Sequence, residues 1–304
     1  MKPVESLCIL LSTCDAYAAV AGQTQRMLAL HWPGHPRLFT CGLSGVSGDD
    51  QLPFQGSDRD WIGITRQAFQ QLRERGYAWA YLILDDHPPM GPCNVQYLNQ
   101  DLPRQAETLS AIQINLLGWD QYQPQHGPVL SRRNLYWQNN DPEFRWKFSL
   151  HPGLWHVASL CDLLDALRRE SPEVQSARSF EGDLDAVARR CFPSLRTRTY
   201  RIRGDGYAAG RHWYEQGWTR RMVRPAVHAA RLLAGLGGET ARASMDERLL
   251  VYLQYLNGPY PMFWSGLIQR RQLHERALRF LQWSGQGALA DAIRSLPMPP
   301  PLTP

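Results

Sequence analysis

Two adjacent acidic residues stand where an apolar run of the sequence ends. The run from Trp79 to Leu84 has the pattern of a strand buried on both faces, and Asp85 and Asp86 follow it directly. In open parallel sheets, ligands bind outside the carboxyl ends of the strands. Two carboxylates there, near a second loop that carries Asp15, could hold Mg2+ or Mn2+ between the protein and phosphate oxygens. The alternative is that the pair caps the following turn, and spacing alone favours this alternative.

The elements that must position these acids alternate between strand and helix. Short apolar runs end at loop residues, and stretches with apolar residues at helical spacing follow them. This alternation predicts an α/β fold with parallel strands. The predicted elements are strands at 7–11, 37–41 and 79–84, a helix that reaches about residue 30, a loop at 42–60 and a helix from 60 to 76.

The remainder of the chain is predicted to be mainly helical, with added strands in the middle. The clearest helix is LWHVASLCDLLDALRR, which places apolar residues on one face. The chain shows no internal repeat. The predictions are helix at 95–117, strands within 130–148, helix at 154–169 and further helices near 220–236, 245–256 and 263–282.

Composition limits the class of protein. The chain has 304 residues, 43% of them hydrophobic, which suits a folded globular protein. No apolar run approaches the roughly 20 residues that cross a bilayer, and the N-terminus lacks a signal-peptide pattern, so we expect a soluble, cytoplasmic protein. The six cysteines show no CxxC or other metal-like spacing, which gives a zinc site little support.

The positive charge lies in the second half of the chain. Residues 1–150 carry 12 basic and 14 acidic side chains, whereas residues 151–304 carry 21 and 14. The segment from Arg196 to Arg231 mixes nine arginines with tyrosines and tryptophans. Such a mixture could bind nucleic acid or meet an anionic membrane surface. A solvated basic surface is the simplest alternative, and no helix-turn-helix, RNP or zinc-finger pattern favours nucleic acid.

Three separated segments together resemble a family of bacterial glycosyltransferases that use nucleotide-sugars and have the GT-A fold, often in polysaccharide and cell-surface glycan assembly. The segments are LLSTCDAYAAVAGQTQRMLALHWPGHP, AYLILDDHPPMGPCN, and FSLHPGLWHVASLCDLLDAL followed by RSFEGDL. Their order and spacing cover roughly residues 6–185. The resemblance implies a GT-A (Rossmann-like) three-layer sheet flanked by helices, with a catalytic domain at 1–195 and a basic, mainly helical region at 196–304.

The resemblance also implies roles for residues of the donor site. Thr13, Asp15, Tyr17 and Asp85 would bind the nucleotide, and a metal would lie at Asp86 and His87. The family's acidic motif would need an acid at position 87, where this chain has histidine. Imidazole suits Mn2+ better than Mg2+, so the implied cofactor is Mn2+ or Mg2+ with metal dependence left open.

The implied catalytic base is Glu181, in the phenylalanine-glutamate pair of the third segment. An inverting transfer needs a carboxylate that takes the proton of the acceptor hydroxyl. Asp183 and Asp185 are close enough in sequence to replace it. The alternative is that Glu181 caps a helix beginning near Leu184.

The predicted function follows from these assignments. We expect transfer of a sugar from a nucleotide-diphosphate donor to a hydroxyl of a glycan or lipid-linked acceptor, with inversion. Contacts to the acceptor or the diphosphate are predicted for His151, Arg211 and His212. Expected partners are the donor, the acceptor and the inner membrane face as a peripheral contact, with no nucleic acid. The alternative is a GT-A-like binding or assembly protein without catalysis.

Overall fold

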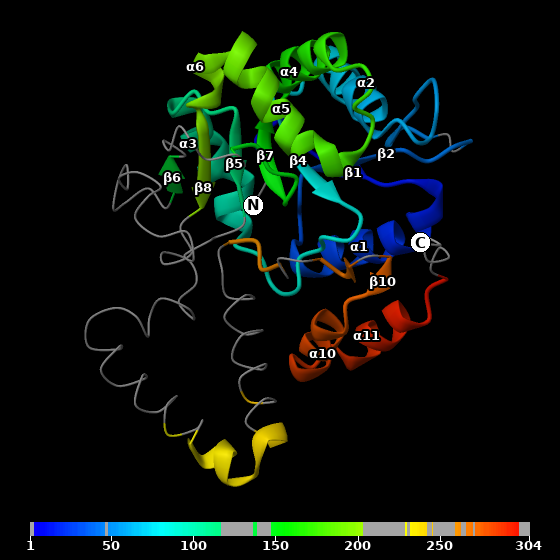
Figure 1. Cartoon of the computed structure of the whole chain (residues 1–304), viewed down its shortest axis with the longest axis vertical. Helices are drawn as coiled ribbons and strands as arrows, with labels where there is room; N and C mark the ends of the chain where they lie inside the picture. Colours follow the sequence, from blue (N-terminus) through cyan, green and yellow to red (C-terminus); the bar gives the residue numbers. More distant parts are fainter. Residues whose placement is uncertain are drawn as a thin grey trace.

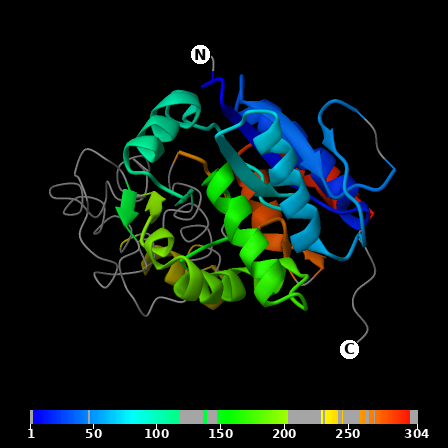
Figure 2. The same ribbon diagram turned by 90° about the horizontal axis from the view of Figure 1, so that it is seen from above.

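The computed structural model describes residues 3–45, 48–116, 136–138, 147–202, 229, 232–241, 245, 259–262, 266–269 and 271–297. These residues form an α/β fold in which helices cover both faces of a central sheet (Figure 1). The view from above shows the helical layers on either side of the strands (Figure 2). The α/β class predicted from the sequence is confirmed.

The central sheet contains eight strands of the described residues, in the order β3-β2-β1-β4-β7-β5-β8-β6. Strands β3, β2, β1 and β4 are parallel to one another. Strand β7 is antiparallel to both of its neighbours, β5 and β8 are parallel, and β6 is antiparallel to β8. The strands are β1 (Leu7–Ser12), β2 (Arg37–Cys41), β3 (Gln51–Leu52), β4 (Trp79–Leu84), β5 (Gln113–Asn115), β6 (Tyr136–Gln138), β7 (Gly153–His156) and β8 (Thr199–Ile202).

The helices begin where the sequence supplies caps. Asp60 accepts a hydrogen bond from the Gly63 amide at 3.0 Å at the start of α2, and Ser176 accepts one from the Ser179 amide at 3.3 Å at the start of α5. The helices are α1 (Ala18–His31), α2 (Trp61–Glu74), α3 (Leu102–Thr108), α4 (Val157–Glu170), α5 (Ala177–Cys191), α6 (Pro193–Arg196), α10 (Glu275–Trp283) and α11 (Gly287–Arg294). A 3-10 turn, η1 (Asp15–Tyr17), precedes α1, and a π-helical turn, η2 (Tyr97–Asp101), precedes α3.

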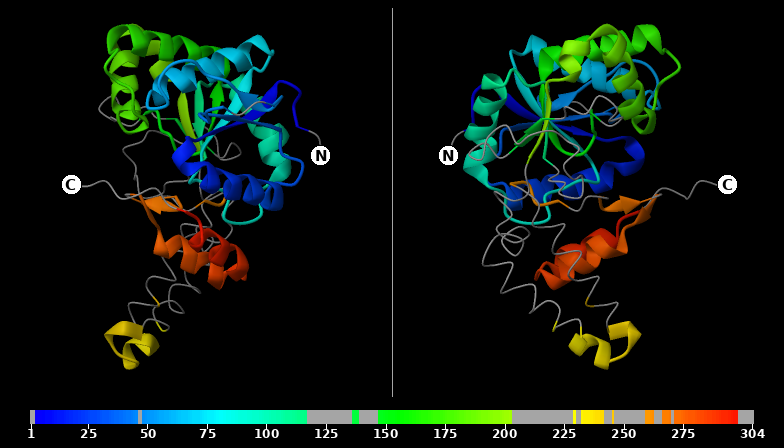
Figure 3. Two further views of the ribbon diagram at one scale, coloured as in Figure 1. Left: turned by 90° about the vertical axis from the view of Figure 1, so that its right-hand side faces the viewer. Right: turned by 60° about the vertical axis from the view of Figure 1, so that its left-hand side comes forward.

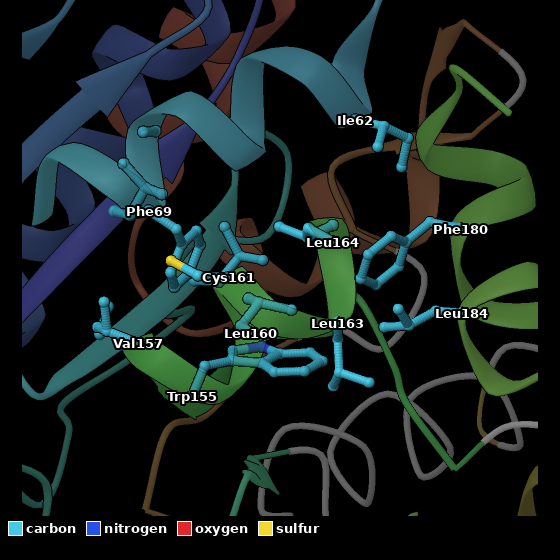
Figure 4. Close-up of a cluster of buried hydrophobic side chains, with 14 of the residues drawn as sticks. Ile62, Phe69, Trp155, Val157, Leu160, Cys161, Leu163, Leu164, Phe180 and Leu184 are labelled. Carbon is cyan, nitrogen blue, oxygen red and sulfur yellow. The ribbon is translucent and has the colours of Figure 1, made fainter. Parts of the chain in front are cut away.

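Strand β1 lies between two hydrophobic cores because successive side chains of a strand point to opposite faces. Cys8 and Leu10 pack in the core beneath α2, α4 and α5, and Leu7, Ile9 and Leu11 pack in the core beneath α1 and α3. Figure 4 shows the first of these cores. All five side chains are buried, which explains the continuous apolar run.

The C-terminal part of the described chain packs on α1. A hairpin of β9 (Ile268–Gln269) and β10 (Gln272–Leu273) leads into α10 and α11, which lie beneath α1 in Figure 3. Met27 of α1 and Met90 join the hydrophobic core of these helices. Strand β8 lies beyond the predicted boundary at residue 195 and belongs to the central sheet.

Four predicted elements are wrong in part. The helix expected at 154–169 begins only at Val157, because residues 153–156 form β7. The helix expected at 95–117 ends at Thr108 and is followed by β5, and the segment 42–60 contains β3. In the segment expected to be helical at 263–282, the hairpin of β9 and β10 precedes α10. Periodicity does not separate a short buried strand from a buried helical turn, which accounts for the first two errors.

No helix within the described ranges combines the length and the apolar character needed to cross a membrane.

Candidate functional site

The ends of β1 and β4 lie side by side, with Ser12 opposite Leu84. Thr13 follows one strand and Asp85 follows the other, and Thr13 Oγ1 donates a hydrogen bond to Asp85 Oδ2 at 2.7 Å. The Asp85 amide donates to the Ser12 carbonyl at 3.0 Å, and Thr24 of α1 donates to the Asp85 carbonyl. The sheet and α1 together therefore hold Asp85 in place.

Asp85 is a half-buried acid beside a second acid. Burial, followed by the charge of the neighbouring Asp86, raises the pKa of its carboxyl to about 7. The Thr13 hydrogen bond, the His87 charge and the Asp86 amide act in the opposite direction. The hydrogen bond to Thr13 spans two strands, so Asp85 does more than cap its own turn.

Asp86 and His87 form a close pair at the rim of the turn. Asp86 Oδ1 lies 2.6 Å from His87 Nδ1, and their side chains are 18% and 12% exposed. Burial lowers the pKa of His87, but the charges of Asp86, Asp85 and Glu181 outweigh it and the pKa is raised. The His87 ring meets the edge of His151, with centroids 5.6 Å apart and planes at 89°.

Glu181 lies on α5, where Phe180 fixes the helix against the core. The Phe180 ring meets Trp61 and Trp155 edge-on, with centroids 5.2 Å and 6.4 Å away. Glu181 Oε1 accepts a hydrogen bond from the Leu150 amide at 2.7 Å. Because α5 begins at Ala177, the alternative that Glu181 caps a helix starting near residue 184 is wrong.

His151 connects the two acidic parts of the site. Its Nδ1 lies 2.9 Å from Ser149 Oγ, and its ring contacts His87. It follows Leu150, whose amide binds Glu181. The structure thus places His87, His151 and Glu181 within one site, although 94 residues separate the first from the last in the sequence (181 − 87).

The two acids proposed as substitutes for Glu181 differ in their surroundings. Asp185 is buried, and its carboxylate binds Arg196 Nε at 2.7 Å and Arg189 at 3.0 Å. These two arginines neutralise the charge of Asp185, and Asp185 is not among the groups that most shift the pKa of His87. Asp183 is half-buried on the same helix, and no ion pair of the described residues includes it.

Asp15 and Tyr17 lie on η1, directly after the Thr13 loop. Asp15 Oδ1 accepts a hydrogen bond from the Ser44 amide at 2.8 Å and is exposed. Burial raises the pKa of the Tyr17 hydroxyl, the Arg271 charge lowers it, and the charges of Asp85 and Asp86 raise it. Tyr17 therefore lies within electrostatic reach of the acidic turn, whereas Asp15 holds the loop after β2.

The sequence analysis did not predict that C-terminal residues contact the acidic turn. The Leu267 amide donates to the Asp86 carbonyl at 2.6 Å, and Tyr260 donates its hydroxyl hydrogen to the His87 carbonyl at 2.7 Å. The Met90 amide donates to the Pro261 carbonyl at 2.5 Å. The only signal in the sequence was the glycine and proline content near residue 260. This content predicts a turn but does not predict which part of the chain the turn contacts.

The side chains at the turn suit a cation that is shared with a bound ligand better than one that is coordinated by the protein alone. No group of three or more His, Cys, Asp or Glu side chains in the described part of the chain is arranged to hold a metal ion. Asp85 and Asp86 each use one carboxylate oxygen in a hydrogen bond with Thr13 or His87. The second carboxylate oxygens of these two aspartates are hard donors of the kind that could share Mn2+ or Mg2+ with ligand phosphates.

Arg211 and His212, the other predicted contacts, lie outside the described residues. No protein-family model matches the chain, and no curated protein is significantly similar to it.

Proposed function

We propose that this protein is a glycosyltransferase that moves a sugar from a nucleotide-diphosphate donor to an acceptor hydroxyl. The observation that carries the proposal is the meeting of two acidic groups from distant parts of the chain. Asp85 and Asp86 come from the end of β4, Glu181 comes from α5, and all three act on the pKa of His87. Clustered titratable groups with shifted pKa values at strand ends are typical of active sites.

The first half of the sheet supports a nucleotide at this site. The order β3-β2-β1-β4 matches the nucleotide-binding half of Rossmann-like folds, in which the ligand binds where the strand order reverses. That reversal falls between β1 and β4, where Thr13 and Asp85 meet. The antiparallel β7 separates this sheet from the fully parallel dinucleotide-binding order and is compatible with the GT-A fold.

Glu181 supports the transfer step. It would take the proton of the acceptor hydroxyl while that oxygen forms a bond to the anomeric carbon of the sugar. The bond from that carbon to the diphosphate oxygen breaks on the opposite face, and the nucleoside diphosphate leaves with the bonding electrons. The Leu150 amide binds Oε1 and orients the carboxylate, and we assign Oε2 to the acceptor hydroxyl.

The remaining partners follow from this chemistry. A divalent cation at Asp86 and His87 would neutralise charge on the diphosphate. The acceptor would be a glycan or a lipid-linked glycan on the His151 side of the site. Contact with the inner membrane face stays a prediction, because most of the basic segment at 196–231 lies beyond the described residues.

The test combines ligand binding with turnover. Nucleoside diphosphates and nucleotide-sugars, each with and without Mn2+, are screened by thermal shift, where a ligand at 100 times its dissociation constant adds about 2.7 kcal/mol of stability. We expect one nucleotide to stabilise the protein and Asp86→Ala to abolish the effect. Glu181→Gln should keep donor affinity and lower donor turnover by roughly 10²- to 10⁴-fold.

Asp183→Asn, on the same helix, is the matched comparison for Glu181→Gln and should keep turnover, whereas a loss there with full turnover in Glu181→Gln would move the base to Asp183. Full turnover in Glu181→Gln would remove the base assignment. Donor binding without turnover in the wild-type protein would favour the non-catalytic alternative. Absence of binding across the panel would leave Asp85 and Asp86 as structural residues of the turn.

A further inference from the structure

The hairpin of β9 and β10 is attached directly to the acidic turn. The Leu267 amide at its base donates to the Asp86 carbonyl at 2.6 Å. Gly266 lies so close that a Cβ at this position would be 2.8 Å from both the carbonyl oxygen and Oδ2 of Asp86. Its φ of +73° also favours glycine. The start of the hairpin is therefore held at a defined place beside Asp86.

The hairpin carries an arginine in a strained conformation. Gln272 pairs with Gln269 and Leu273 with Ile268, so Arg271 lies in the turn between the two strands. Its φ is +64°, a left-handed conformation that is uncommon for residues other than glycine, asparagine and aspartate. Two-residue hairpin turns commonly use this conformation, which fixes the direction of the turn that carries Arg271.

The base of the hairpin is held by a hydrogen bond and by hydrophobic packing. The His274 amide donates to the Leu267 carbonyl at 2.7 Å, and α10 begins at the next residue. Leu267 packs with Met27 of α1 in the C-terminal core, and Figure 1 shows β10 beside α1. The turn with Arg271 thus projects from a fixed base, and the Arg271 side chain is exposed.

Arg271 brings positive charge to an acidic site. Its charge acts on the Tyr17 hydroxyl, and Asp85 and Asp86 act on the same hydroxyl with the opposite sign. Arg271 and the two aspartates therefore all lie within electrostatic reach of the Tyr17 hydroxyl. A diphosphate beside two aspartates requires cationic partners, and the planar guanidinium of arginine binds two phosphate oxygens at once.

We propose that Arg271 binds the diphosphate of the donor from the C-terminal side of the site. This inference rests on the proposed function. The hairpin that carries Arg271 is bound at its base to the Asp86 carbonyl, and Arg271 lies in its turn. Thr13 and Tyr17 would hold the nucleoside, and Arg271 would hold the phosphates. The C-terminal hairpin thus becomes part of the donor site.

The experiment measures affinity by isothermal titration calorimetry with three probes in Mn2+. They are inorganic pyrophosphate, the nucleoside diphosphate that stabilises the wild-type protein, and the corresponding nucleoside without phosphates. Arg271→Gln should bind both diphosphates roughly 10- to 100-fold more weakly, since a charge-assisted hydrogen bond is lost. Affinity for the nucleoside should not change. Arg271→Lys should restore part of the loss.

Arg271→Gly separates binding from structure. Glycine adopts a positive φ without strain, so this variant removes the guanidinium without opposing the turn conformation and should stay folded while it loses diphosphate affinity. Arg104→Gln, at an exposed arginine of α3, is the charge-matched control and should bind all three probes normally.

The outcomes distinguish the two proposals. If the wild-type protein binds the diphosphates and Arg271→Gln binds them equally well, the role of Arg271 is excluded and the donor site stands. If Arg271→Gln weakens binding of the nucleoside as much as binding of the diphosphates, the arginine acts on the fold and the inference fails. If the wild-type protein binds no nucleotide, the proposed donor site itself fails.

Discussion

Two aspartates in this protein, Asp185, which is buried, and Asp85, which is half-buried, have opposite electrostatic surroundings. Asp185, on α5, is 2% exposed and lies between Arg196 and Arg189. Asp85, at the end of β4, accepts a hydrogen bond from Thr13 and lies beside a second carboxylate, Asp86. No arginine or lysine among the described residues forms an ion pair with Asp85.

The difference teaches how to separate structural from functional carboxylates here. A buried charge is costly unless it is paired, and removing one partner of a buried pair destabilises the fold. Asp185 meets this requirement within the protein. Asp85 does not, and its pKa is raised to about 7 by burial and by Asp86. A carboxylate with a raised pKa and no cationic partner in the protein is typical of a site that binds a cation or a cationic group.

The largest expected effect is at Asp185. Asp185→Asn leaves Arg196, which is 7% exposed, buried without its carboxylate, and should lower the free energy of unfolding by about 3–5 kcal/mol. Urea denaturation measures the loss. Asp183→Asn on the same helix is the control and should change stability by less than about 0.5 kcal/mol. Equal effects at the two positions would contradict the comparison.

The second effect concerns Asp85 and has the opposite sign. An unfolded aspartate titrates near pH 3.9, and the folded pKa of Asp85 is about 7, so the folded state holds an extra proton between these values. The wild-type protein therefore loses stability, relative to Asp85→Asn, as pH rises from about 4 to 7. In EDTA, the asparagine variant should be more stable at pH 8 by on the order of 2–4 kcal/mol, from roughly 1.4 kcal/mol per unit.

The difference between Asp85→Asn and the wild-type protein should vanish below about pH 4, where Asp85 is protonated in both states. Urea midpoints at several pH values between 4 and 8 provide the measurement. A difference that is independent of pH would show that Asp85 is compensated in the folded protein like Asp185.

The third effect tests how the C-terminal segment holds the acidic turn. Gly266→Ala places a Cβ 2.8 Å from Asp86 at a φ of +73°, and should cost about 1–3 kcal/mol. Gly285→Ala is a matched control, because its φ is +80° and no atom lies within 4 Å of the added Cβ. It should cost about 1 kcal/mol. Thermal denaturation compares the two variants. Equal losses of stability would show that backbone strain alone, and not the contact with Asp86, sets the cost of Gly266→Ala.

Much of the first half of the fold was predictable from local signals. Strands β1, β2 and β4 and helix α2 follow from short apolar runs, helical spacing and the glycine at position 76. The position of Asp85 and Asp86 at a strand end is confirmed for the same reason. Strand β7 was missed because Leu154 stands at helical spacing from Val157 and Cys161, so the apolar pattern of α4 extends back into the strand.

The amino-acid sequence by itself determined which residues end the buried strands. An apolar run must pack against other parts of the protein, and the polar residues that follow it must contact a ligand, a partner or water. Only the tertiary structure decided which carboxylate is neutralised. Arg196 reaches Asp185 across the turn between α5 and α6, whereas Thr13 and Gly266 reach the acidic turn from far along the chain. Burial and charge act through distance in space, and spacing in the sequence does not record that distance.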